Sequence, residues 1–204
     1  MIHNIIFDIG NVLADFRWKD LFKDLGFIGE KFDRMAEITV MHPTMWNEFD
    51  RSLLSDEELI AKCIENAPEC EKEIRLLFNN MEFLVKEYTY SYDWIKRLKA
   101  QGYNVYLLSN YARTSFEAAK KHGGLSFLSL VDGGVISYEV QIVKPEPEIY
   151  KLLLEKYNLK AEECVFLDDR TDNIEAAEAF GIHGIVVKSY EQAVESLEKV
   201  LNEA

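Results

Sequence analysis

Short apolar runs recur along this chain, and three of the four end in a polar or glycine-containing turn. The runs cover residues 5–7, 105–108, 164–167 and 185–187. Apolar runs of this length are typical of strands that are buried on both faces of a parallel sheet. Residues 131–135 contain two adjacent glycines and break the pattern, so they predict a small hairpin or turn.

Segments with helical periodicity separate these runs. Ser91 is placed to cap one such helix, and Ser189 with Gln192 resembles a capping box for another. Other helices are expected after Tyr111, from Pro145 and from Thr171. Because strands alternate with helices, the sequence predicts an α/β fold in which helices cover both faces of a parallel sheet.

Residues 15–90 differ from the rest of the chain, because they contain no convincing strand. Ser55 and Glu58 form a good capping box, and apolar residues follow at helical spacing. The sequence therefore predicts a helical insertion over 15–90, with a core made of residues 1–14 and 91–204.

Composition narrows the classes of function. About half of the 204 residues are hydrophobic, which is enough for a sizeable core, and the formal net charge is −13. Such a surface repels nucleic acids and anionic membranes, so neither is an expected partner. Three cysteines without close pairs favour a reducing compartment, the cytoplasm. We find no signal peptide and no membrane-spanning run, and the sequence is compatible with a monomer.

Polar residues gather where the predicted strands end. Asp8, Ser109, Asp168 and Asp169 follow three apolar runs, and Lys144 precedes a predicted helix. Taken singly, each residue is explained by a turn or a helix cap. Together they predict a site at the carboxyl edge of the sheet, where open α/β sheets bind ligands. Three carboxylates repel one another unless a cation joins them, and oxygen ligands without histidine favour Mg²⁺.

Four motifs in this order resemble those of the haloacid dehalogenase-like hydrolases that carry a helical cap after the first motif. The motifs are Phe-Asp-Ile-Gly-Asn-Val-Leu at 7–13, Leu-Leu-Ser-Asn at 107–110, Lys-Pro-Glu-Pro-Glu-Ile-Tyr at 144–150, and the acidic segment 166–177. The resemblance covers the whole chain. It implies a Rossmann-like three-layer α/β/α core with the cap at 15–90.

The resemblance also implies a nucleophile and a metal site. Asp8 attacks phosphorus and forms an aspartyl-phosphate. Mg²⁺ is held by the Asp8 carboxylate, the backbone carbonyl of Gly10 and Asp169, and Asp168 either contacts the metal through water or orients its ligands.

By the same resemblance, Ser109, the Asn110 backbone N–H group and Lys144 bind the phosphoryl group. Asn173 stands where many relatives have an acidic residue, and we expect it to form hydrogen bonds within the site.

Two departures from the family pattern matter. Most phosphatases of this family have a second aspartate two residues after the nucleophile, as a proton donor, but this chain has Gly10. A bacterial subgroup that resembles glucose-1-phosphate phosphatases shares the Asp-x-Gly-Asn-Val motif. Asp15 is a candidate replacement donor. Gln141 stands where relatives often have glycine, which predicts a local change of the backbone.

The cap is expected to set substrate choice by closing over the site. Trp18, Trp46, Phe49 and Arg51 are candidates to contact the substrate.

The sequence therefore predicts a Mg²⁺-dependent hydrolase of small phosphorylated metabolites, with sugar phosphates as the expected class. Three alternatives stay open. A 2-haloacid dehalogenase uses the same nucleophile without metal, although that branch usually has an aromatic residue at the position of Gly10. A phosphomutase shares the first half-reaction, and a phosphate-binding protein without activity is the third.

Overall fold

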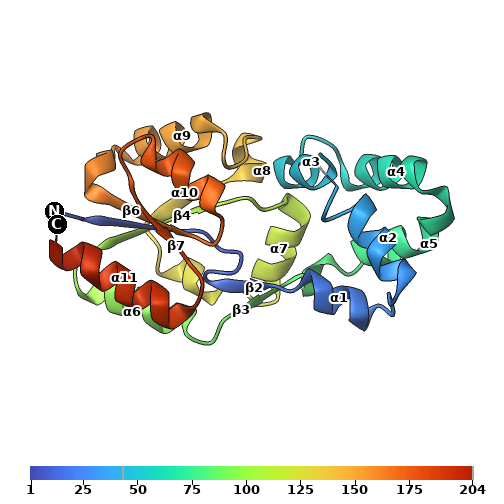
Figure 1. Ribbon diagram of the computed structural model, residues 1–204, viewed down its shortest axis with the longest axis horizontal. Coiled ribbons are helices and arrows are strands. Elements are labelled where there is room, and N and C mark those ends of the chain that lie inside the picture. The colour runs from blue at the N-terminus through green and yellow to red at the C-terminus, as the bar shows by residue number, and fades with distance from the viewer. Residues whose placement is uncertain (43, 204) are drawn as a thin grey trace.

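A five-stranded parallel sheet forms the centre of the larger lobe in the computed structural model, which describes residues 1–42 and 44–203 (Figure 1). The strand order is β5-β4-β1-β6-β7, and every neighbouring pair is parallel. The strands are β1 (Asn4–Phe7), β4 (Asn104–Ser109), β5 (Gly133–Ile136), β6 (Cys164–Asp168) and β7 (His183–Val186). This confirms the predicted α/β class.

Helices cover both faces of the sheet. Figure 1 shows α6 (Ser91–Ala100) and α11 (Tyr190–Glu203) on one face, with α9 (Pro147–Tyr157) and α10 (Thr171–Glu178) on the other. Along β1, Ile5 and Phe7 belong to one buried cluster, whereas Ile6 belongs to a second one on the opposite face. Two-sided burial explains why these strands are apolar at every position.

The inserted helices pack around an apolar cluster of their own. They are α1 (Trp18–Asp24), α2 (Glu30–Ile38), α3 (Met45–Arg51), α4 (Asp56–Asn66) and α5 (Glu71–Phe78). The predicted capping box begins α4, since the Ser55 hydroxyl accepts from Glu58 N and the Glu58 carboxylate accepts from Ser55 N. Figure 1 shows these helices as a separate lobe beside α7 (Arg113–Lys121) and α8 (Ser137–Val140).

Two short strands occur where we predicted none. Ala14–Phe16 forms β2 and Val85–Glu87 forms β3, and they pair antiparallel where the chain enters and leaves the helical lobe. Strands of three residues are too short to show an alternating pattern, so they could not be recognised from the sequence. Ser91 also differs from the prediction: its hydroxyl donates to the Leu13 carbonyl oxygen at 2.6 Å instead of capping α6.

The predicted hairpin at 131–135 was wrong, because Gly133 and Gly134 lie in β5, a parallel edge strand beside β4. These glycines serve close packing. A Cβ atom on Gly133 would lie 2.5 Å from the Tyr157 hydroxyl oxygen, and one on Gly134 would lie 2.8 Å from the Leu107 carbonyl oxygen. The two adjacent glycines suggested a turn. In the fold they instead leave room for Tyr157 and Leu107 to pack against the strand.

Gln141 has a φ of 61°, the left-handed conformation that glycine adopts most easily. All three cysteines are buried and free. Within residues 1–42 and 44–203, no helix combines the length and apolarity needed to cross a membrane.

Candidate active site

Three aspartates meet at the carboxyl edge of the sheet. Phe7 lies opposite Leu107 in β4 and opposite Leu167 in β6, so the residues that follow these three positions share one edge. Asp8, Asp168 and Asp169 each bring a carboxylate oxygen to within 4.8 Å of the others. The predicted strand ends thus converge on one small volume.

Lys144 joins two of these carboxylates. Its side chain is only 1% exposed, and its Nζ lies 2.9 Å from Asp8 Oδ1 and 2.6 Å from Asp168 Oδ2. Burial alone would lower the pKa of Lys144, but the charges of Asp168 and Asp8 outweigh it and hold the pKa above its usual value. Lys144 therefore stays cationic and anchors the centre of the site.

The charge of this centre is not balanced by its own residues. Three carboxylates face a single lysine, and burial raises the pKa of Asp8 to about 6 against the opposing charge of Lys144. Burial likewise raises the pKa of Asp169. Raised pKa values in a cleft mark a place where a bound cation would stabilise the ionised carboxylates.

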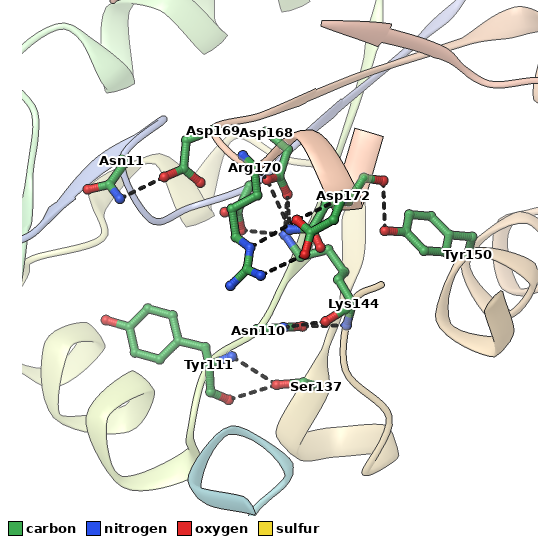
Figure 2. A network of polar contacts seen from close by, with 12 residues as sticks. Asn11, Asn110, Tyr111, Ser137, Lys144, Tyr150, Asp168, Asp169, Arg170 and Asp172 are labelled. Carbon is green, nitrogen blue, oxygen red and sulfur yellow. Dashed lines mark hydrogen bonds and ion pairs between the residues drawn. The ribbon is translucent and has the colours of Figure 1, made fainter. Parts of the chain in front are cut away.

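Asp168 accepts hydrogen bonds from three groups of this chain. Its oxygens accept from Lys144 Nζ, from the Arg170 backbone N–H at 2.8 Å, and from Asn173 Nδ2 at 3.0 Å (Figure 2). The expected hydrogen bonds of Asn173 within the site are therefore present. Because Asp168 is fully buried, its role in this geometry is to orient Lys144 and the following loop.

Asp169 is more open, and its surroundings fit a hard cation. Its only side-chain hydrogen bond among the described residues comes from Asn11 Nδ2 at 2.8 Å (Figure 2). The Gly10 carbonyl accepts no hydrogen bond from the described residues, because the neighbouring bridge uses the Ile9 and Ala14 carbonyls. Asp8, Gly10 and Asp169 thus offer oxygen ligands only, the donor set that Mg²⁺ prefers.

The loop after β4 completes the phosphate side of the site. Ser109 ends β4 and is buried, and its hydrogen bond to Asp8 lowers the pKa of that carboxyl group. The Asn110 side chain forms two hydrogen bonds with the Lys144 backbone (Figure 2). It donates to the carbonyl oxygen at 3.0 Å and accepts from the N–H group at 2.7 Å. The second and third motifs are therefore locked together.

A cavity of about 320 Å³ opens from this edge toward the helical lobe. Asp8, Gly10, Lys144 and Asp169 lie at its floor. Its apolar walls come from β2, α3, β3 and the segments next to α2 and β3: Phe16, Val40, Trp46, Phe49, Leu84 and Val85. This size suits a small organic ligand.

The structure brings only some of the predicted cap residues to the cavity. Trp46 and Phe49 line it, whereas Trp18 packs against Phe22 and Phe32 inside the helical lobe. Arg51 forms an ion pair with Glu146 instead.

Asp15, the candidate donor, lies opposite Lys86 in the β2–β3 pair and does not line the cavity.

Sequence reasoning missed several polar residues of the cavity. Asn11, Asp50, Tyr111 and Ser115 all line it. Asn11 belongs to the first motif and has a φ of 55°, which asparagine tolerates better than most residues. Asp50 lies in the last turn of α3 and is 7% exposed, but an acidic residue within a helix gives no signal of burial in the sequence.

Comparisons with known proteins agree with this geometry. A family model described as haloacid dehalogenase-like hydrolase matches residues 2–181. A HAD family enzyme from Bacteroides thetaiotaomicron, solved with magnesium and inorganic phosphate, is 26% identical, with a TM-score of 0.72 and coverage of 93% of this chain and 96% of that chain.

Curated relatives differ in length. Sesquiterpene phosphatase astK of Aspergillus oryzae is 25% identical over 187 residues, which are 88% of this chain and 87% of that protein. Acyl-CoA dehydrogenase family member 10 of Mus musculus is 34% identical over 124 residues, 59% of this chain, but the match spans only 11% of its length. The match of the family model to most of the chain, together with the four motifs at one edge of the sheet, shows that this protein belongs to the haloacid dehalogenase-like hydrolases.

Proposed function

We propose that this protein is a Mg²⁺-dependent phosphate monoester hydrolase that acts on small phosphorylated metabolites through an aspartyl-phosphate on Asp8. The observation that carries the proposal is the grouping of three carboxylates with a buried lysine that pairs with two of them, at the edge of the sheet where a cavity opens. The magnesium and phosphate of the Bacteroides enzyme and the phosphatase name of the Aspergillus relative support it.

The residues divide the chemistry between them. An Asp8 carboxylate oxygen attacks phosphorus, while Lys144 and the hydroxyl of Ser109 bind phosphoryl oxygens, aided by the Asn110 N–H group. Mg²⁺, held by Asp8, the Gly10 carbonyl and Asp169, would supply the positive charge that these residues lack. Asp168 keeps Lys144 in place, because its two oxygens accept from three donors of the chain.

Sugar phosphates are the substrate class that we propose. The cavity of about 320 Å³ accommodates a ligand of that size, and it combines the apolar wall with the polar side chains of Asn47, Asp50, Tyr111 and Ser115. Such a mixed wall suits a sugar ring, which has both apolar faces and hydroxyl groups. We also propose a cytoplasmic site of action, which the three free, buried cysteines support.

The dehalogenase alternative is less well supported by the site. Displacement of halide at carbon needs one carboxylate nucleophile, whereas this site adds Asp169, with a single hydrogen bond from Asn11, and the free carbonyl of Gly10. Those two groups have a use in phosphoryl transfer, as ligands for a cation. No comparable use exists in attack at carbon.

A panel of phosphate monoesters, assayed with and without a chelator, tests the proposal. We expect phosphate release that is lost with chelator and restored by Mg²⁺. We expect Asp8→Asn to lower turnover by at least about 10⁴-fold, because it removes the nucleophile. Asp20→Asn, an exposed change on α1, is the matched control and should keep full activity. Chelator-resistant phosphate release, or chloride release from 2-chloropropionate, would contradict the proposal.

A further inference from the structure

The cavity needs a proton donor that the first motif does not supply. When the bond from phosphorus to the leaving oxygen breaks, an alkoxide of high pKa leaves slowly unless it is protonated. Gly10 has no side chain, and Asp15 does not line the cavity. The donor must therefore be sought among the other residues that face the reacting centre.

Few of the cavity side chains can give up a proton at neutral pH. Lys144 is held cationic between two carboxylates, and Arg170 stays charged at any ordinary pH. Burial and the charge of Asp50 raise the pKa of Tyr111 far above neutrality. Asp8 is needed as the nucleophile and Asp169 as a cation ligand. Among the described lining residues, the carboxyl group of Asp50 remains.

The backbone of Asp50 is fixed beside the site by one buried hydroxyl. Ser137 Oγ donates to the Asp50 carbonyl oxygen at 2.7 Å and accepts from the Tyr111 N–H at 2.8 Å. Figure 2 shows Ser137 beside Tyr111, with dashed lines joining its hydroxyl group to the Tyr111 backbone. Ser137 is fully buried, so α3 of the cap is tied to the loop that follows β4.

Neighbouring contacts hold this part of the cap in the same position. Arg51 forms an ion pair with Glu146, and its Nη1 donates to the Gln141 carbonyl oxygen at 2.9 Å. Ser52 Oγ accepts from the Arg113 N–H at 3.0 Å. Three consecutive cap residues, starting at Asp50, therefore bind the core directly.

The side chain of Asp50 is left without a partner. Among residues 1–42 and 44–203, no hydrogen bond or ion pair engages its carboxyl group, although the residue is only 7% exposed and lines the cavity together with Asp8. A carboxyl group that lines a cavity and has no partner from the chain is free to pair with a bound ligand. The arrangement is explained if the substrate supplies the partner.

We infer that Asp50 is the proton donor and acceptor of the reaction, an assignment that rests on the proposed phosphatase function. As Asp8 bonds to phosphorus and the bond to the leaving oxygen breaks, that oxygen takes the proton of the Asp50 carboxyl group. The Asp50 carboxylate then takes a proton from the water that attacks the aspartyl-phosphate. Inorganic phosphate leaves, Asp8 regains its electron pair, and Asp50 regains its proton.

The charges around Asp50 favour the protonated form at the start. Burial and then the charge of Asp8 raise the pKa of Asp50 to about 8, although Lys144 and Arg170 oppose them. Tyr111 is the other titratable group that interacts with it, and it stays neutral. At pH 7 the free site therefore holds Asp50 as an acid, and after proton transfer it is a competent base.

Asp50→Asn tests the inference, because it keeps the shape and the Ser137 contact but removes the dissociable proton. We expect kcat/KM for an alkyl phosphate to fall by at least about 100-fold, and for p-nitrophenyl phosphate by less than about 5-fold, because nitrophenolate leaves without a proton. In the wild type, kcat/KM for the alkyl ester should decline as the pH is raised and Asp50 loses its proton, and the variant should lack this decline. Glu48→Gln, on the same helix but outside the cavity, should match the wild type in every assay.

A second variant places a new acid at position 10, on the core. A Cβ atom on Gly10 would lie 3.9 Å from Phe16 Cβ and 4.0 Å from Asp8 Oδ2, so a side chain fits there. Gly10→Asp should therefore recover at least about 10-fold of the alkyl-phosphate activity in the Asp50→Asn background.

Three results would overturn the inference. They are equal losses for both esters, an unchanged pH profile in Asp50→Asn, or no recovery in the double variant. A wild-type protein that hydrolyses neither ester would overturn the proposed function itself.

Discussion

Replacing Asp50 by asparagine should change how the stability of the protein depends on pH. Asp50 is 7% exposed, and burial, with the charge of Asp8, raises the pKa of its carboxyl group from 3.8 to about 8. A group with a raised folded-state pKa contributes its full stability below the unfolded value. That contribution is lost as the pH rises through the folded value, because only the unfolded chain ionises freely.

The magnitude follows from these two pKa values. Each unit of difference is worth about 1.4 kcal/mol. Ionisation of Asp50 in the unfolded chain therefore lowers the free energy of unfolding of the wild type by about 2 kcal/mol at pH 5 and about 4 kcal/mol at pH 7. Asparagine cannot ionise, and the cost of burying its amide does not depend on pH. The free energy of unfolding of the variant, relative to that of the wild type, should thus rise by about 2 to 3 kcal/mol from pH 5 to pH 7.

Urea unfolding at constant ionic strength between pH 5 and pH 8 measures this gain. Equal m-values in the two proteins would show that the surface exposed on unfolding is the same. Glu48→Gln, on the same helix, provides the control and should give a curve parallel to the wild type. A constant difference between Asp50→Asn and the wild type at every pH would refute the reasoning.

Two further changes test contacts described above. Arg51→Met should lower the free energy of unfolding by about 1 kcal/mol, because the pair with Glu146 is partly exposed and screened. A double-mutant cycle with Glu146→Gln should give a coupling that weakens as salt is raised, and a coupling of zero would contradict the contact. Gln141→Gly should raise the free energy of unfolding by up to about 1 kcal/mol, since the φ of 61° suits glycine. A lower melting temperature would argue against backbone strain there.

The strand ends of the core could be predicted from sequence because each strand carries its own signal. An apolar run followed by Asp8, Ser109 or Asp168 identifies both the strand and the edge that it presents. The edge strand β5 lacked that signal, since its paired glycines exist to admit Tyr157 and to pack on Leu107. Local sequence therefore identified the central strands and failed where a distant side chain decides the residue type.

The cap side of the site was predictable only in part, for a related reason. Trp18 and Trp46 look alike in sequence, but one packs against Phe22 inside the lobe and the other faces the cavity. Which aromatic residue faces the ligand depends on how five helices pack against the core. The burial of Asp50 could not be predicted for the same reason, because it depends on the contact with Ser137, which lies in another part of the chain.

A proton donor on the cap has a consequence for the reaction as a whole. In the family pattern the donor follows the nucleophile by two residues, so it moves with the core. Here the donor would reach the leaving oxygen only while Asp50, Arg51 and Ser52 keep their contacts with the core. Cap closure and proton transfer then become one event, which restricts rapid cleavage to ligands that let the cap close. Space at Gly10 does not force this arrangement, because a Cβ atom there meets only ordinary contacts. Since Asp50→Asn should be slower and should gain stability relative to the wild type as the pH rises from 5 to 7, the buried carboxyl group is best explained by catalysis.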